Sequence, residues 1–214
     1  MDLTGKTVLV IGGSGALGSI FVQKLSDLGA TVLATASSNE SAARIPQSAS
    51  QRLLLDLTKT ESIKALCDWI LTTEELTGIV NAAGVVGFGP AEEVDQNQSL
   101  KMNQINYLGP MEIFTALRPK LAQQDESFLI NISGIVAQTP LPNMAHYSAS
   151  KSGIHGFLMA ATREWRRSGT KVHSSILGHT ETGLANRPLF GTAPQMPQGL
   201  SPEDAVDSIL KEVI

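Results

Sequence analysis

Residues 7–18 read TVLVIGGSGALG, and this stretch decides the fold of the chain. Its first five residues are mostly apolar and β-branched, which predicts a short strand buried on both faces. A glycine-rich turn follows, and then a helical pattern that ends at Gly29. The apolar residues expected on the buried face of this helix are Leu17, Ile20, Phe21, Leu25 and Leu28.

The turn has the spacing Gly12–x–x–Gly15–x–x–Gly18, which differs from the G-x-G-x-x-G of the usual dinucleotide fingerprint. Glycines permit a tight turn, and a helix N-terminus presents N–H groups and a positive dipole end to a phosphate. Because the turn lies between a strand and a helix, it predicts a pyrophosphate site. The residues expected to form this site are Gly12, Ser14, Gly15, Ala16, Leu17 and Gly18.

The rest of the chain alternates strands with helices. Further strands are expected at residues 31–35, 53–57, 78–80, 128–132 and 172–176, and the longest helices at 99–121 and 147–168. Ser201 and Pro202 begin a last helix. The pattern predicts an α/β fold, a Rossmann-like doubly wound parallel sheet in a single domain, residues 1–214. In the helix 99–121 we expect these residues to face inward: Leu100, Ile105, Leu108, Ile113 and Leu117.

Open parallel sheets bind ligands at the carboxyl ends of their strands. The second strand leads into Ser37 and Ser38 without the acid that would hold a ribose diol, which favours NADP(H) over NAD(H); a merely polar loop is the alternative. After the third strand, Asp56, beside Leu57, could contact an adenine or simply terminate the strand.

The fourth strand ends in small residues that would let a flat ligand lie against the backbone. These residues are Asn81, Ala82, Ala83 and Gly84. The alternative for Asn81 is that it only bridges neighbouring strand ends.

Composition excludes several classes of function. The chain has a net charge of −4 and a pI near 5.6, which gives no electrostatic footprint for nucleic acid. Cys67 is the only cysteine, so neither an intrachain disulfide nor a cysteine-based metal site is expected, and the thiol is predicted to be buried. The sequence shows neither a signal peptide nor an apolar run long enough to span a bilayer, so we expect a cytoplasmic protein without a membrane partner.

Tyr147 and Lys151 lie four residues apart in a predicted helix and therefore share a face. A nearby ammonium favours phenolate and is expected to lower the pKa of Tyr147, which would make the phenol a usable acid or base. The pair is also a common accident on amphipathic helices. Asn106 lies inside the helix 99–121, where asparagine is intrinsically disfavoured, so it has either a hydrogen-bonding role or simple solvent exposure.

Taken together, these motifs resemble the short-chain dehydrogenase/reductase family over nearly the whole chain. The resemblance rests on the order and spacing of the glycine turn, the strand end Asn81–Gly84, Asn106, the strand Asn131–Ser133 and the Tyr147/Lys151 pair. It implies a NAD(P)-binding Rossmann domain that moves hydride between nicotinamide and a carbonyl or alcohol substrate.

The resemblance also implies roles for single residues. Tyr147 would be the acid/base, Lys151 would lower its pKa and bond the nicotinamide ribose, and Asn106 would hold a water in a proton relay. Gly178, Thr180 and Thr182 begin a Pro/Gly-rich segment and would lie beside the cofactor.

The sequence departs from the family pattern at four places. Ile11 and Ala82 stand where threonine and a second asparagine are usual, and the chain stops early at the C-terminus, so it is expected to be truncated relative to the family. The serine that polarises the substrate normally lies thirteen residues before the tyrosine, where this chain has Gly134. We expect Ser133 to replace it, with its side chain swung into the site because the strand has already ended. The alternatives are that Thr139 or a water molecule donates instead, or that the enzyme is slow.

Two functions remain open. The first is an NAD(P)-dependent oxidoreductase acting on an uncharged small carbonyl or alcohol, with Tyr147, Lys151, Asn106 and Ser133 as catalytic residues. The second is a non-catalytic NAD(P)-binding sensor, which Gly134 favours. The helices of Asn106 and Tyr147 would permit a homodimer, and no metal site is expected.

Overall fold

The computed structural model describes residues 1–73 and 75–214 and shows one six-stranded parallel sheet between two layers of helices. The strands lie in the order β3-β2-β1-β4-β5-β6. Their bounds are β1 Thr7–Ile11, β2 Thr31–Ala36, β3 Gln51–Leu54, β4 Gly78–Asn81, β5 Ser127–Ile132 and β6 Thr170–Ser175. The order reverses between β1 and β4, where doubly wound sheets bind ligands. The predicted fold class is confirmed.

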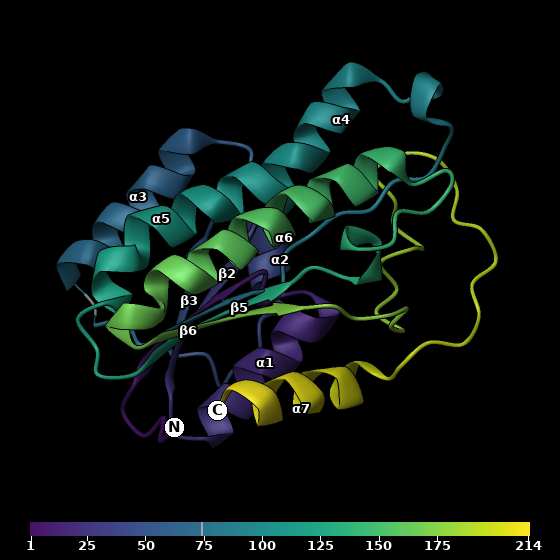
Figure 1. The fold of residues 1–214 in the computed structure, drawn as a ribbon. Helices are drawn as coiled ribbons and strands as arrows, with labels where there is room; N and C mark the ends of the chain where they lie inside the picture. The colour runs from purple at the N-terminus through teal and green to yellow at the C-terminus, as the bar shows by residue number, and fades with distance from the viewer. Residues whose placement is uncertain (74) are drawn as a thin grey trace.

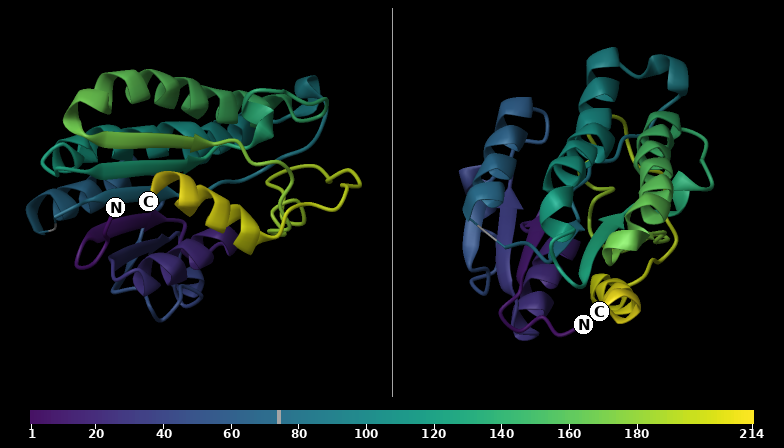
Figure 2. Two further views of the ribbon diagram at one scale, coloured as in Figure 1. Left: turned by 60° about the horizontal axis from the view of Figure 1, so that its bottom comes forward. Right: turned by 60° about the vertical axis from the view of Figure 1, so that its left-hand side comes forward.

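Helices α3, α5 and α6 cover one face of the sheet, and α1 and α7 cover the other (Figures 1 and 2). Their bounds are α1 Ala16–Asp27, α2 Asn39–Ala42, α3 Thr60–Thr73, α4 Gln96–Asn103, α5 Gly109–Leu121, α6 Ala145–Trp165 and α7 Pro202–Val213. Short 3₁₀ turns lie at Ala91–Glu93, Ile135–Ala137 and Arg166–Ser168. Ser201 caps α7 by accepting a hydrogen bond from Asp204 N, as the sequence indicates.

The two cores follow the alternation of side chains along the strands. In β5, Leu129 faces α3, α5 and α6, whereas Phe128 and Ile130 face α1 and α7. Cys67 is buried in the core between the sheet and helices α3, α5 and α6. Burial raises the pKa of its thiol to about 12, as expected for a structural cysteine.

Several predicted details of the elements are wrong. The third strand ends at Leu54 rather than Leu57, because the chain turns at Asp56, whose carboxylate accepts from Thr58 N and Oγ1. Leu28, Leu100 and Leu108 are exposed rather than inward.

The helix predicted at 99–121 is α4 and α5 joined by a π-helical turn, Gln104–Leu108. A π turn adds a residue and changes which side chains face the core, so a strict 3.6-residue pattern fails there.

Candidate active site

The glycine turn packs directly on the end of β4. A Cβ on Gly12, whose φ is +80°, would lie 2.8 Å from Ala83 Cα, and one on Gly18 would lie 2.1 Å from Gly12 O. A side chain at Gly12 would therefore push the turn away from the end of β4, and one at Gly18 would push α1 away from the turn. Thr35 holds the turn, because its Oγ1 accepts from Gly12 N at 3.2 Å and its carbonyl accepts from Gly13 N at 2.9 Å.

The N-terminus of α1 faces this turn without a capping side chain. Gly15 is the N-cap residue, and the described residues supply neither a side-chain cap nor an acid in the first turn. Ser14, Ala16 and Leu17 are partly exposed around it. A bare helix start beside a close-packed glycine turn suits a pyrophosphate, so the residues present fit a dinucleotide.

Two of the residues predicted to contact the cofactor at the ends of β2 and β3, Ser38 and Asp56, form hydrogen bonds within the protein. Ser38 is the N-cap of α2 and accepts from Ser41 N at 3.2 Å, whereas Ser37 is exposed beside it. Asp56 holds its own turn, and its hydrogen bond from the Thr58 hydroxyl is the main cause that lowers the pKa of its carboxyl. Leu57 is buried.

Asn81 bridges two strand ends. Its Nδ2 donates to Asn131 Oδ1 at 2.7 Å, and its Oδ1 accepts from Ala83 N at 3.3 Å. The bridging alternative for Asn81 is thus present. The contact also fixes the strand-end residues from Ala82 to Gly84 next to the glycine turn.

Tyr147 and Lys151 lie on the same face of α6, and both are buried, with exposed fractions of 9% and 6%. Lys151 Nζ donates to Ile132 O at 2.8 Å and lies 6.0 Å from the centre of the Tyr147 ring. Burial lowers the pKa of Lys151 to about 8.

The expected direction of the Tyr147 pKa is wrong for this arrangement. Burial raises it to about 12, because removal of the phenolate from water is the dominant effect. The ammonium is directed at the Ile132 carbonyl rather than at the phenol oxygen. At neutral pH the phenol therefore keeps its proton and can donate it.

Asn106 is buried in the π turn, and its side chain clamps the loop after β4. Its Oδ1 accepts from Val85 N at 2.9 Å, and its Nδ2 donates to Val85 O at 2.8 Å and to Ser150 Oγ at 3.0 Å. A Cβ on Gly84 would lie 3.3 Å from Lys151 Nζ and 3.4 Å from Asn106 Oδ1, so these three residues meet. The amide is thus fully used by protein atoms, and a water-holding role for Asn106 stays a prediction.

Ser133 does not point where we expected. It is 0% exposed, and its hydroxyl lies 2.9 Å from Asn131 Nδ2 and 2.7 Å from Ser174 Oγ. Side chains alternate along the extended chain, so the residue before the substrate position faces into the protein. Gly134 occupies that position with φ +82° and ψ 158°, a conformation that is essentially reserved for glycine.

The segment after β6 is held by local bonds at the predicted residues. Thr180 Oγ1 donates to Gly178 O at 3.2 Å, Thr182 N donates to Thr180 O at 2.7 Å, and Thr182 Oγ1 accepts from Leu184 N at 3.3 Å. Among the described residues, no hydrogen bond joins Gly178, Thr180 or Thr182 to the glycine turn or to the end of β4, so their cofactor role also remains a prediction.

Sequence reasoning missed several residues that support the site. Thr35 and Ser150 hold the glycine turn and Asn106, respectively. His146, next to Tyr147, lies 2.7 Å from Ser99 Oγ through Nδ1 and 2.9 Å from Ala91 O through Nε2. Ser150 follows Tyr147 by three residues, so the helical repeat could have indicated that it lies on the same face as Tyr147. The partners of His146 are too distant in sequence for any local pattern to indicate them.

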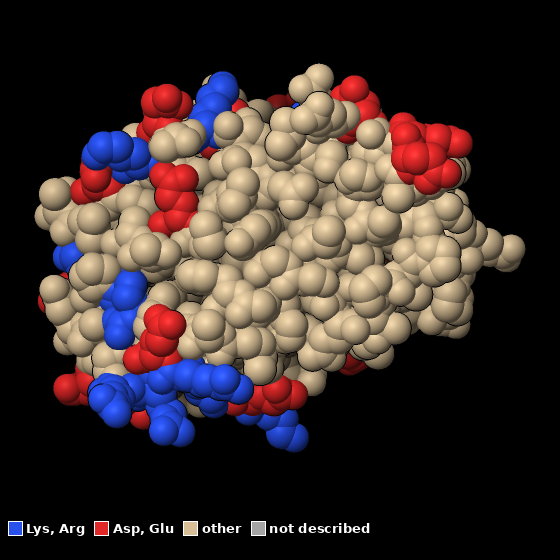
Figure 3. All heavy atoms as spheres, turned by 45° about the horizontal axis from the view of Figure 1, so that its top comes forward, with Lys and Arg blue, Asp and Glu red and all other residues tan. Residues whose placement is uncertain are grey.

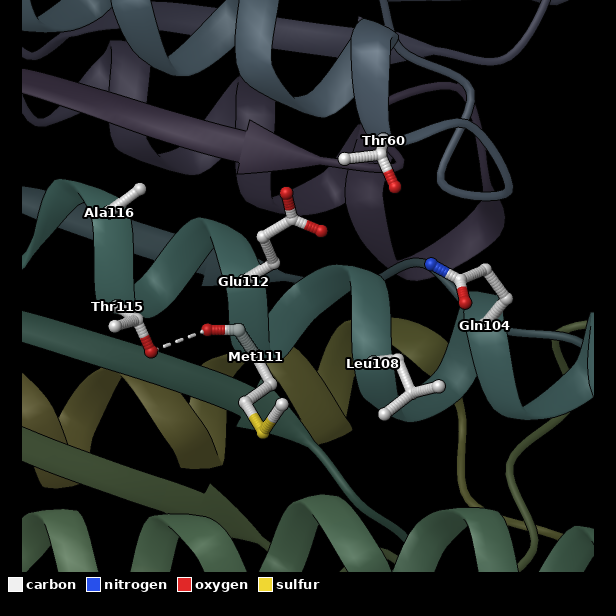
Figure 4. A pocket seen from close by; sticks show the side chains of 7 residues that line it. All are labelled: Thr60, Gln104, Leu108, Met111, Glu112, Thr115 and Ala116. Carbon is white, nitrogen blue, oxygen red and sulfur yellow. Dashed lines mark hydrogen bonds between the residues drawn. The ribbon is translucent and has the colours of Figure 1, made fainter.

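A hollow of about 590 Å³ lies outside this site, on the start of α3 and the outer side of α5 (Figure 4). It is lined by Thr60, Gln104, Leu108, Met111, Glu112, Thr115 and Ala116. None of these residues belongs to the predicted site.

In the part of the chain that the structure describes, no three His, Cys, Asp or Glu residues are placed to share a metal ion. Over the same residues, no helix combines the length and the apolar character that crossing a bilayer requires.

Comparison with known proteins identifies the family. A family model described as short chain dehydrogenase matches residues 6–188. The chain belongs to this family. Human short-chain dehydrogenase/reductase family 9C member 7 is 28% identical over 209 residues, which are 91% of this chain and 66% of that protein. Mouse retinol dehydrogenase 7 is 29% identical over 190 residues, which are 86% and 60%. The chain thus spans less than two thirds of the length of these curated relatives.

Solved structures of two dehydrogenases share the fold. The enzyme of Burkholderia cenocepacia J2315, in complex with NADP, superimposes with a TM-score of 0.84 at 25% identity and covers 99% of this chain and 85% of its own. The aldohexose dehydrogenase of Thermoplasma acidophilum, ligand-free, has a TM-score of 0.85 at 18% identity and covers 99% and 88%.

The buried ammonium gives a prediction for stability against pH. An unfolded lysine holds its proton up to about pH 10.5, whereas folded Lys151 releases it near pH 8, so unfolding takes up a proton between these values. The free energy of unfolding of the wild type should therefore rise over this range, relative to Lys151→Met, by up to about 1.4 kcal/mol per pH unit.

Urea denaturation of both proteins between pH 7.5 and 10 measures this difference. Tyr147 and Cys67, whose pKa values are raised, are present in both proteins, so their opposite effect cancels. Lys101→Met, at an exposed position, is the control and should follow the wild type. Parallel curves for the wild type and Lys151→Met would show that the lysine is not desolvated.

Proposed function

We propose that the chain is an NAD(P)(H)-dependent oxidoreductase that interconverts a carbonyl and an alcohol. The observation that supports it best is the meeting of Lys151, Asn106 and Gly84 beside the glycine turn, with Tyr147 on the same helix face as Lys151. A protein that only bound a nucleotide would have no physical need to bury an ammonium and a phenol at that place. Membership of the short chain dehydrogenase family supports the same activity.

Each residue has a role in this proposal. The glycine turn and the start of α1 hold the pyrophosphate, and the small residues from Ala82 to Gly84 let the cofactor lie against the backbone. When bound, the nicotinamide supplies or accepts the hydride. Tyr147 donates a proton to the substrate oxygen in reduction and removes it in oxidation. Lys151 positions the cofactor ribose and, as a cation, stabilises the phenolate that proton donation leaves.

We further propose a preference for NADP(H) over NAD(H). No acid stands at the end of β2, and exposed Ser37 could bond a 2′-phosphate. The related Burkholderia enzyme in complex with NADP supports this choice. Ser38 contributes less than the sequence suggested, because its hydroxyl caps α2.

We also propose a homodimer through the outer face of α4, α5 and α6. Figure 3 shows this side of the molecule, where charged side chains gather at the margins and leave a broad uncharged middle. Leu100, Leu108 and Met159 are exposed on these helices. Light scattering of the full chain should give twice the monomer mass, and a monomer would contradict the proposal.

The second candidate, a non-catalytic NAD(P)-binding sensor, is favoured by Gly134 alone. Where it has been measured, loss of one donor to a developing oxyanion costs on the order of 10²–10³ in rate. The two candidates differ in whether NADPH is consumed in the presence of a ketone panel.

Tyr147→Phe tests the acid/base role. The ring and its packing remain, so we expect NADPH affinity, measured by nicotinamide fluorescence, to change less than about threefold, whereas turnover falls by 10²-fold or more, about what general acid–base catalysis contributes. Titration with NADH on the same samples measures the cofactor preference. Unchanged turnover would refute the assignment, and a wild type that binds NADPH but turns over no ketone would favour the sensor.

Gly134→Ser and Gly134→Ala form a matched pair that tests the missing hydroxyl. Both should lower the free energy of unfolding by about 1–3 kcal/mol, because residue 134 has φ +82°. A Cβ there meets only Leu177 O, at 3.8 Å, so the cost is conformational rather than steric. If the rate is limited by the missing donor, the serine variant should exceed the alanine variant in kcat/KM by about tenfold or more. Equal values would show that another group already serves the substrate oxygen.

A further inference from the structure

Tyr147 lies under an apolar cover built from four separate segments, namely the loop after β4, α4, residues 134–146 and the segment after β6. The buried members of this cluster are Val86, Phe88, Met102, Val136, Met144 and Tyr147. Leu184, Leu189 and Phe190, from the segment after β6, pack against them. Any substrate that reaches the phenol must therefore lie among hydrocarbon side chains.

Two of these segments are fastened to each other. Leu189 N donates to Val86 O at 2.7 Å, and Phe88 N donates to Phe190 O at 3.0 Å. We call residues 86–88 together with 189–190 the clasp. The residue that follows Phe88 is bonded to the segment just before α6, because Gly89 N donates to Asn143 O at 2.8 Å.

The clasp closes by direct contact between Phe190 and Gly87. A Cβ on Gly87 would lie 2.4–2.6 Å from three atoms of the Phe190 ring, so the ring lies flat against a backbone that only glycine leaves free. Gly191 permits a similar approach on the next residue, where a Cβ would lie 1.7 Å from Phe88 O. The ring of Phe190 therefore has one well-defined place, over Gly87.

Charged side chains of the surrounding segments are directed elsewhere. In the segment 177–200, Glu181 Oε1 accepts from Gly199 N at 2.8 Å, and Arg187 Nε donates to Gly183 O at 3.3 Å. Glu92 and Glu93 are exposed, and Glu93 lines a hollow of about 340 Å³ that Phe88 and Phe190 also line, so its side chain lies beside the cover. The segment 134–146 contains no Asp, Glu, Lys or Arg.

We infer that the site takes an uncharged, apolar ketone or alcohol, and that Phe190, seated on Gly87, sets the largest hydrocarbon group it accepts. The inference rests on the proposed oxidoreductase function and names its substrate class. A carboxylate-bearing substrate would lose its hydration without finding a cation in the cover. An alkyl chain would exchange water for side-chain contacts, and its length would be limited by the closed clasp.

A series of methyl ketones of increasing chain length, with keto acids of matched length and NADPH as cofactor, tests the substrate class. In the wild type, kcat/KM should rise with chain length up to a limit, by up to about tenfold per methylene, and should be on the order of a hundredfold lower for the keto acids. Equal or better use of the keto acids would overturn the inference.

Phe190→Ala and Gly87→Ala test the size limit. Phe190→Ala removes the ring, and Gly87→Ala puts a methyl group where the ring now lies and so displaces the ring. Both variants should therefore move the chain length with the highest kcat/KM to longer ketones by several carbons. Gly156→Ala on α6 is the matched control, because a Cβ there would meet no atom of the described residues within 4 Å apart from the backbone of its own helix, and it should keep the wild-type limit. An unchanged limit in both clasp variants would also overturn the inference.

Amide hydrogen exchange separates this inference from the proposed function. In Gly87→Ala, the amides of Phe88 and Leu189 should exchange at least about tenfold faster than in Gly156→Ala, because their bonds close the clasp. A saturating long-chain alcohol with NADP should slow them in the wild type, and a matched carboxylate should not. If no carbonyl compound is turned over, the proposed function fails, and the exchange rates alone then test whether the clasp is closed by these bonds. Unchanged exchange rates in Gly87→Ala would refute the clasp.

Discussion

The site depends on one buried cation. Lys151 is almost without solvent, and an ammonium in that position is tolerated only with a strong acceptor, which the Ile132 carbonyl provides at the end of β5. That bond ties α6 to the end of β5, the neighbour of β4, and the glycine turn packs against the end of β4. Tyr147 comes to the same edge because it precedes Lys151 by one helical turn.

The parts around this cation are held by side-chain amides rather than by charges. Asn106 grips both polar atoms of the Val85 backbone, and Asn81 bridges β4 to β5. These bonds are 2.7–2.9 Å long and both asparagines are buried, so the loop that carries Gly84 has little freedom relative to Lys151. A crevice fixed in this way is already shaped for a flat ligand, which lowers the entropy lost when one binds.

Local patterns were enough to predict the sheet and its helices, and they singled out Lys151, Asn106 and Gly84, which the structure brings together. The glycine turn and the Tyr147/Lys151 pair are short motifs, and their meaning depends only on neighbours in sequence. The failures have long-range or backbone causes. The direction of Ser133 depends on where β5 stops, Leu100 and Leu108 depend on a π turn, and the raised pKa of Tyr147 depends on a cover built from distant segments. No periodicity reports those contacts.

A row of polar side chains on the α6 side of the sheet also affects the register in which the strands pair. Asn81 is in register with Asn131, and Asn131 with Ser174; Ser133 links the last two, and His155 Nδ1 lies 2.8 Å from Ser174 Oγ. A shift of either pairing by one residue would leave an amide or hydroxyl stranded in hydrocarbon, whereas the apolar residues of these strands could tolerate it. The row therefore favours the observed register of β4, β5 and β6 over one shifted by a residue.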